Sequence, residues 1–319
     1  MTTSTAGSSG CGACAGARWT RERRAQRPTS APRSLSNRSG GTAVFKALLA
    51  LEAQAGDCFV APAAPERAGR LYGGQLLAQA LAAAQRTVGE DRDVHSLHAY
   101  FLRPGNVDHG SDIEVERVRD GRSFSTRSVR SLQHGKELFR MLVSFHVSEQ
   151  GDAFAGHAMP EVPPPEDVTL TYDAFRRTQG VADDWDGGVR PMDLRYVNPP
   201  DAPPGEPVLE NQRVWARIDE RLPDDWPTHF AGLAYLADST LVDSVVLPHG
   251  QRWHDPRLNG ASLDHAMWFH GRARADEWLL LDQSVEATGD GLGLAAGRFF
   301  DRSGALVATC TQQGLIRWE

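Results

Sequence analysis

The stretch GGQLLAQALAAAQRTV, residues 73–88, decides the fold. Its apolar residues recur at spacings of three and four, the period that places side chains on one face of an α-helix. The residues on this face are Leu76, Leu77, Ala80, Leu81 and Ala84. The spacing predicts an amphipathic helix whose apolar face has to be covered by other parts of the chain.

The residues that follow this helix are expected to cover its apolar face. Four runs alternate in polarity or are rich in β-branched residues, and Gly-containing turns such as Asp120-Gly121 and His134-Gly135 separate them. The runs are 95–102, 111–121, 123–135 and 136–147. Together with a short helix that begins at Ala43, they predict a unit over 43–147 in which an antiparallel sheet wraps one long helix.

A second unit, 205–319, repeats the order of the first. It has a strand-like run at 210–218, a helix-compatible run at 236–246 and then further strand-like runs. These later runs are 262–270, 276–288, 292–304 and 305–318. The segments HAYF (98–101) and HAMW (265–268) take equivalent places. The pattern predicts a duplicated α+β fold.

Two segments fall outside the predicted units. Residues 148–204 are rich in proline and acidic residues, so we expect a linker with one short helix from Tyr172 to Gln179. Residues 1–42 are rich in Arg, Ser and Gly without apolar periodicity, which predicts a disordered tail. The tail fits both an organellar transit peptide and a start codon assigned too far upstream, and its Cys11-x-x-Cys14 pair stands alone.

The composition excludes several classes of protein. Of 319 residues 40% are hydrophobic and 24% charged, which is typical of a globular chain, and the net charge is −7. Because the basic tail offsets a still more acidic body, we expect no nucleic-acid partner. No apolar run approaches 18 residues, so no stable membrane insertion is expected. Four cysteines indicate a reducing compartment, and the cytoplasm is the expected location.

The common catalytic motifs are absent from the sequence. There is no GxSxG, GxxxxGK[ST] or HExxH, and GDGLGLAAG (289–297) predicts a turn rather than a nucleotide site. His265 and His270 lie five residues apart on one strand, so they point to opposite faces and cannot be joint metal ligands. His95 is a minor candidate base. We expect no metal and no cofactor.

Three polar residues fall where the repeat predicts core. They are Asp238 at the start of the second predicted helix, Ser262 entering a strand and Gln312 within the last strand. Burying a carboxylate, a hydroxyl and an amide is costly unless these groups pair or bind something. Each residue alone has an ordinary structural explanation, but together they mark a candidate site.

Several long motifs in the same order resemble the acyl-CoA thioesterase II family. They are YGGQLLAQAL (72–81), VHSLHAYFLRPG (94–105), RDGRSFSTRSV (119–129), DSTLVD (238–243), LDHAMWFH (263–270) and TQQGLIR (311–317). The resemblance implies a double-hotdog α+β fold. It also implies that the chain hydrolyses acyl-CoA to free fatty acid and CoA, so that CoA enters as part of the substrate.

The same resemblance implies a catalytic set of Asp238, Ser262 and Gln312 that holds the attacking water. The family usually has Thr where this chain has Ser262, and an acidic residue where it has Gln313. A thioester carbonyl is electrophilic, so an oriented water and a general base can suffice. Gly73 and Gly74 are candidate substrate-binding residues, because backbone N–H groups at a helix start can stabilise an oxyanion.

Two other functions remain open at this point. A hotdog protein could bind acyl-CoA without hydrolysing it, although the intact polar set argues against this. A hotdog dehydratase would need a histidine near the helix, and neither predicted helix carries one. The resemblance and the exposed sheet edges favour a homo-oligomer, while the preferred acyl chain length depends on a tunnel that the sequence does not locate.

Overall fold

The computed structural model describes residues 44–63, 69–178 and 190–319. The tail predicted at 1–42 lies outside these residues. The helices are α1 (Val44–Leu48), α2 (Gly73–Gln85), α3 (Tyr172–Thr178), α4 (Trp226–Ala237) and the 3-10 helix η1 (Val242–His249). The strands are β1 (Glu52–Ala53), β2 (Cys58–Ala61), β3 (Arg92–Phe101), β4 (Ser111–Asp120), β5 (Phe124–Gln133), β6 (Lys136–Val147), β7 (Met192–Tyr196), β8 (Gln212–Ile218), β9 (Leu258–Ser262), β10 (Asp264–Phe269), β11 (Leu279–Gly289), β12 (Leu292–Phe300) and β13 (Leu306–Trp318).

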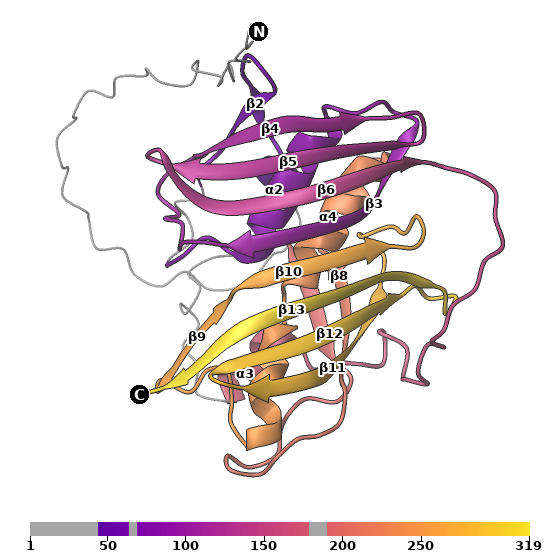
Figure 1. Ribbon diagram of the computed structural model, residues 1–319. Helices are drawn as coiled ribbons and strands as arrows, with labels where there is room; N and C mark the ends of the chain where they lie inside the picture. The colour runs from indigo at the N-terminus through magenta and orange to yellow at the C-terminus, as the bar shows by residue number, and fades with distance from the viewer. Residues whose placement is uncertain (1–43, 64–68, 179–189) are drawn as a thin grey trace, which may run out of the picture.

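One continuous antiparallel sheet runs through both halves of the chain (Figure 1). Its main strand order is β1-β2-β4-β5-β6-β3-β10-β13-β12-β11-β8-β7, and β9 pairs with β13 at the side. The halves join where β3 pairs with β10, and this register sets His98 opposite Ala266 and Ala99 opposite His265. Since His98-Ala99 and His265-Ala266 are the equivalent pairs of the repeat, the two halves meet about a pseudo-twofold axis.

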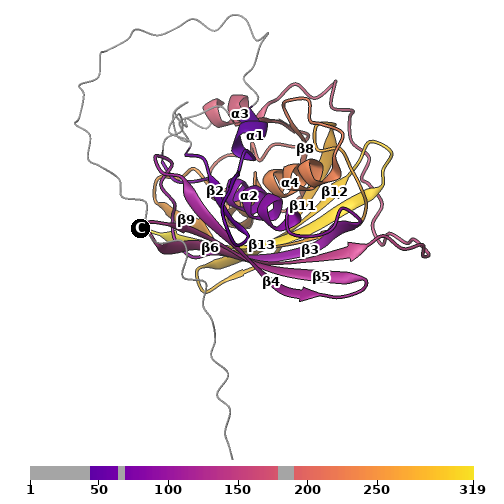
Figure 2. The ribbon, with the colours of Figure 1, turned by 90° about the horizontal axis from the view of Figure 1, so that it is seen from above.

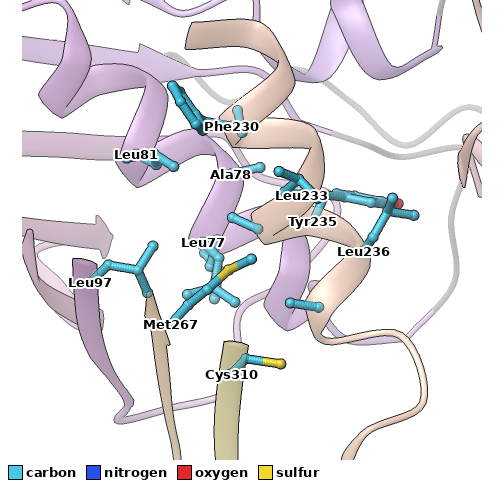
Figure 3. Close-up of a cluster of buried hydrophobic side chains, with 14 of the residues drawn as sticks. Leu77, Ala78, Leu81, Leu97, Phe230, Leu233, Tyr235, Leu236, Met267 and Cys310 are labelled. Atoms are coloured by element: carbon cyan, nitrogen blue, oxygen red, sulfur yellow. The ribbon is translucent and has the colours of Figure 1, made fainter. Parts of the chain in front are cut away.

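The two long helices lie on the same side of the curved sheet (Figure 2). Leu77 and Leu81 of α2 and Phe230 and Leu233 of α4 are buried in the main hydrophobic core. Figure 3 shows these side chains between the helices, with Met267 of β10 below them. The predicted arrangement of a long helix wrapped by an antiparallel sheet in each half is confirmed.

The second long helix begins ten residues before the predicted one. The prediction placed it at 236–246, whereas α4 spans Trp226–Ala237 and the chain then turns into η1. Asp225 caps α4 by accepting a hydrogen bond from the Thr228 N–H at 2.9 Å. The pattern was missed because α4 is buried on nearly every side, so its sequence is apolar all round and shows no amphipathic period.

The continuous segment from α4 through η1 is also longer and more apolar than expected. Trp226–His249 has a mean hydropathy of 1.4 over its most apolar window, enough to cross a membrane by length and composition alone. However, 94% of that window is buried inside the protein. This burial is typical of a core helix, which needs the same apolar composition as a membrane span.

The predicted linker is partly structured. The short helix expected from Tyr172 is α3, and Met192–Tyr196 forms β7. Strand β7 pairs with β8 and thereby extends the sheet of the second half. The proline-rich composition of 148–204 obscured this strand. Prolines elsewhere in a segment do not prevent a short run from pairing with the edge of a sheet.

Candidate active site

Asp238 lies where the two halves of the protein meet. It is the C-cap of α4, not a helix start as predicted, and it is 8% exposed. A carboxylate is unfavourable at the negative end of a helix dipole. It is stabilised here by the N-terminus of α2, where the backbone N–H of Gly74 donates to Oδ2 of Asp238 at 2.8 Å.

The double glycine at the start of α2 permits this close approach. A Cβ atom at Gly73 would lie 2.6 Å from Oδ2 of Asp238. A Cβ atom at Gly74 would lie 2.4 Å from the carbonyl oxygen of Tyr235. Both glycines are therefore required by the contact between the two helix ends, and their predicted role in binding the substrate stays a prediction.

Gln312 is the second residue of the site. Its side chain is fully buried in β13, and its Nε2 donates to Oδ1 of Asp238 at 2.5 Å. Its Oε1 has no hydrogen-bond partner among the described residues. The amide thus orients the carboxylate with its donor and leaves its acceptor free for a ligand.

Burial changes the acidity of Asp238. Loss of water around the carboxylate raises its pKa from 3.8 to about 6, and this effect exceeds the lowering by the hydrogen bonds from Gln312 and Gly74. Arg190 also lowers the pKa of Asp238 through its positive charge. A carboxylate with a pKa of about 6 is ionised at neutral pH and is a better proton acceptor than an ordinary Asp.

Ser262 lies on the same face of the sheet as Gln312, and no hydrogen bond joins it to Gln312 or Asp238 in the described structure. It ends β9 and pairs with Gly314 of β13, two residues beyond Gln312. A Cβ atom at Gly314 would meet Val242 of η1, so the side chains at this position of the sheet point toward η1. Ser262 therefore shares the inner face with Gln312, and it is half-buried.

His265, which the sequence analysis considers only as a metal ligand, lies next to Gln312. It follows Asp264 in β10. Because the next residue, Ala266, pairs with Thr311 of β13, His265 lies across from Gln312. Its ring is 1% exposed and neither ring nitrogen has a hydrogen-bond partner among the described residues. Burial lowers the pKa of His265 to about 4, and Gln312 offsets this only in part, so the ring is neutral at physiological pH.

Two other histidines lie outside the site. His95 contacts Ser144, with 2.8 Å between Nε2 and Oγ, and it makes no contact with Asp238. His229 lies on α4, so the helix of the second half does contain a histidine, contrary to the prediction. It is in the first turn, at the opposite end from Asp238, and its Nδ1 accepts the N–H of Ala275 at 3.1 Å.

Tyr72 and Tyr235 hold the two helix ends together. The hydroxyl of Tyr72 donates to the carbonyl oxygen of Tyr235 at 2.9 Å, and the rings meet edge to face at 4.9 Å. The guanidinium of Arg190 lies over the ring of Tyr72 at 4.9 Å. These residues could be found only from the tertiary structure, because nothing in their spacing relates residues 72, 190 and 235.

The arrangement is suited to activating a water molecule. Asp238 can accept one proton of the water and the free Oε1 of Gln312 can accept a hydrogen bond from the other. An ionised base held in a buried site next to helix N–H groups is suited to attack on a carbonyl carbon, with the developing oxyanion near the start of α2.

Two family profiles match this chain. The family profile described as the acyl-CoA thioesterase N-terminal domain matches residues 61–146. The profile described as the acyl-CoA thioesterase C-terminal domain matches residues 162–316. Together the two profiles cover most of the described chain.

Individual proteins show the same relationship. Acyl-coenzyme A thioesterase 8 of Mus musculus is 36% identical over 259 residues, which cover 78% of this chain and 80% of that protein. The crystal structure of acyl-CoA thioesterase II TesB2 from Mycobacterium marinum is 38% identical, with a TM-score of 0.71 over 86% of this chain and 98% of that one. A hot dog fold protein from Alicyclobacillus acidocaldarius has a TM-score of 0.71 at 21% identity, over 88% of this chain and all of that one, and it supports the fold.

Proposed function

The chain belongs to the acyl-CoA thioesterase II family and hydrolyses acyl-CoA, and we propose that Asp238 is the general base of the reaction. The observation that carries this proposal is the hydrogen bond from Gln312 to Asp238, formed between two buried side chains from different elements of the double hotdog. Burying an amide and a carboxylate together is costly, and the acceptor of the amide has no partner among the described residues. Both features fit a site that holds a water molecule.

In the proposed mechanism Asp238 removes a proton from the water as its oxygen attacks the thioester carbonyl. Gln312 fixes the carboxylate and the water, while Ser262, next along the inner face of the sheet, completes the water's hydrogen bonds. The backbone N–H of Gly73, at the start of α2, stabilises the oxyanion. The C–S bond then breaks and CoA leaves as its thiolate, which takes up a proton.

The scheme needs no metal or cofactor, because a thioester is electrophilic enough to react with water that a carboxylate has activated. Dialysis against a chelator should therefore leave turnover unchanged. Loss of turnover that a divalent metal restores would contradict this part of the proposal.

The deciding experiment measures free CoA thiol released from straight and branched acyl-CoAs of increasing chain length. Wild-type protein should release CoA, and Asp238→Asn should lose about 10²-fold or more in kcat while remaining folded. Near-wild-type turnover by folded Asp238→Asn would overturn the assignment of the base. Binding of acyl-CoA without any thiol release by the wild type would favour a non-catalytic acyl-CoA-binding protein.

A homo-oligomer is the second part of the proposal. The outer face of the sheet, where β3 meets β10, exposes Tyr100 (61%), Leu142 (49%) and Trp268 (37%). Trp268 packs edge to face against His98, so this apolar patch spans both halves of the chain. A second copy placed back to back would cover it. Light scattering should show a dimer or higher oligomer that Trp268→Glu dissociates, and a monomeric wild type would refute the proposal.

The cytoplasm stays the proposed location. It is supported by Cys310, a buried thiol that forms no disulfide among the described residues, as in a reducing compartment. Fractionation of the native host should recover the thioesterase activity with cytoplasmic markers, and recovery with a membrane or organellar fraction would contradict it.

A further inference from the structure

A cavity lies next to the candidate active site, on the side of η1. Its apolar walls include Tyr196 and Trp253, and its polar floor includes Gln212, Gln283, Thr240 and Asp243. Its volume is about 30 Å³, which is enough for one small polar group. We call it the polar side cavity.

Two glutamines in this floor carry groups without partners. Gln283 is 1% exposed and Gln212 is 4% exposed, and they face each other across paired strands β11 and β8. Nε2 of Gln283 and Oε1 of Gln212 have no hydrogen-bond partner among the described residues. A buried donor beside a buried acceptor, each unpaired, costs free energy unless a ligand or ordered water binds both.

Thr240 connects this floor to the reacting groups. It lies two residues after Asp238, and its hydroxyl donates to Oε1 of Gln283 at 3.0 Å. That bond uses the acceptor of Gln283, and Nε2 has no partner among the described residues. Thr240 therefore links Gln283 in the cavity floor to the turn that carries Asp238.

Asp243 adds a carboxyl group to the cavity. The hydroxyl of Tyr172 lies 3.5 Å from its Oδ2. Burial raises the pKa of Asp243 to about 7, so the carboxyl is partly protonated near neutral pH and can then donate a hydrogen bond as well as accept one. A plain alkyl chain would leave Nε2 of Gln283 and Oε1 of Gln212 unsatisfied.

We propose that the polar side cavity is a substrate subsite in which Gln283 and Gln212 recognise a hydroxyl or amide group on the thioester substrate. The inference rests on the proposed thioesterase function. Such a group has two sources, a hydroxyl on the acyl chain or an amide of the pantetheine arm of CoA. Both sources present a donor and an acceptor close together, as the two glutamines require.

The test compares kcat/KM for three kinds of substrate. These are octanoyl-CoA, hydroxyoctanoyl-CoA isomers with the hydroxyl at successive carbons, and the octanoyl thioester of 2-mercaptoethanesulfonate, which has no amide. Each is measured with wild type, Gln283→Leu and Gln212→Leu. Gln54→Leu, at an exposed position far along the sequence from the cavity, is the matched control and should change nothing. Thermal unfolding shows which variants fold, and one folded cavity variant is enough for the test.

Two results support the subsite and identify its ligand. If an acyl hydroxyl binds, wild type should prefer one hydroxy isomer over octanoyl-CoA by roughly ten-fold or more, and the glutamine variants should lose that preference. If pantetheine binds, the variants should lose roughly ten-fold on every CoA ester and nothing on the amide-free thioester.

Two other results overturn the subsite. They are an equal loss on all substrates, including the amide-free thioester, and no loss on any substrate by folded variants. The failure of the proposed function itself looks different, because wild type would then release no thiol from any of the CoA esters.

Discussion

Gly74 donates its backbone N–H to Asp238 at 2.8 Å, across 164 residues of chain. The donor belongs to the first residues of α2 in the N-terminal half, and the acceptor ends α4 in the C-terminal half. The positive end of one helix dipole thus stabilises a carboxylate at the negative end of the other. Each half alone therefore contains only part of the candidate active site.

Gly74→Ala should separate the two helix ends. A new Cβ atom 2.4 Å from the carbonyl oxygen of Tyr235 forces the backbones apart. We expect the free energy of unfolding to fall by about 1–3 kcal/mol and turnover to fall at least ten-fold. Thermal denaturation and thiol release measure the two effects. Gly271→Ala is the control, because nothing lies within 4 Å of a Cβ atom there, and equal behaviour of both variants would contradict the prediction.

Asp238→Asn should stabilise the protein while it abolishes turnover. Because burial raises the folded-state pKa of Asp238 to about 6, the wild type loses stability as the pH rises from about 4 through 6 and the carboxyl ionises. The neutral amide avoids this cost, which corresponds to roughly 1–3 kcal/mol at pH 7. Melting temperatures should therefore differ most at pH 7 and converge near pH 4. A less stable variant at pH 7 would show that the carboxylate is a net stabilising group.

The activity of the wild type should fall on the acid side with an apparent pKa of about 6. Asp238 must be ionised to act as a base, so kcat should drop about ten-fold per pH unit well below that value. Removing the hydrogen bond from Gln312, which lowers the pKa of Asp238, should move this limb to higher pH in Gln312→Leu. An acid limb near pH 4 in the wild type would mean that another group limits the rate.

Ser262 and Gln312 should affect kcat more than KM. Alanine at Ser262 or leucine at Gln312 removes a partner of the attacking water but no apolar contact with the acyl chain. We expect kcat to fall by roughly ten-fold to a thousand-fold while KM changes little. Ser262→Thr keeps the hydroxyl and serves as the matched control, with turnover near that of the wild type. A rise in KM at constant kcat would instead assign both residues to substrate binding.

Arg127 should stabilise the N-terminal half strongly. Its side chain is 1% exposed, and its guanidinium donates to Oγ1 and the carbonyl oxygen of Thr87, just beyond α2, at 2.8 and 2.9 Å. Arg127→Met removes the side-chain donor to the carbonyl oxygen of Thr87 and the ion pair with Asp120, so the free energy of unfolding should fall by about 2–4 kcal/mol. Arg117→Met breaks an exposed pair with Asp57 and should cost less than about 1 kcal/mol. Chemical denaturation measures both, and similar losses would contradict the role of burial.

The amphipathic period of residues 73–88 and the alternation of the longer strands were sufficient to predict α2 and the long antiparallel strands of both halves, because burial of one face produces a regular period in the sequence. The same rule explains why α4 was misplaced, since a helix buried on all sides has no such period. For the same reason Asp238 was predicted at a helix start, although it lies at a helix end.

The sequence by itself determined the duplicated α+β units, and its motifs identified Asp238, Ser262 and Gln312 as candidates. Only the tertiary structure decided that Gly74 holds the carboxylate and that a neutral His265 lies across from Gln312. These relations depend on strand register and on the contact between two helix ends from different halves. Local periodicity records which face of an element is buried, but it carries no record of which distant residue lies against that face.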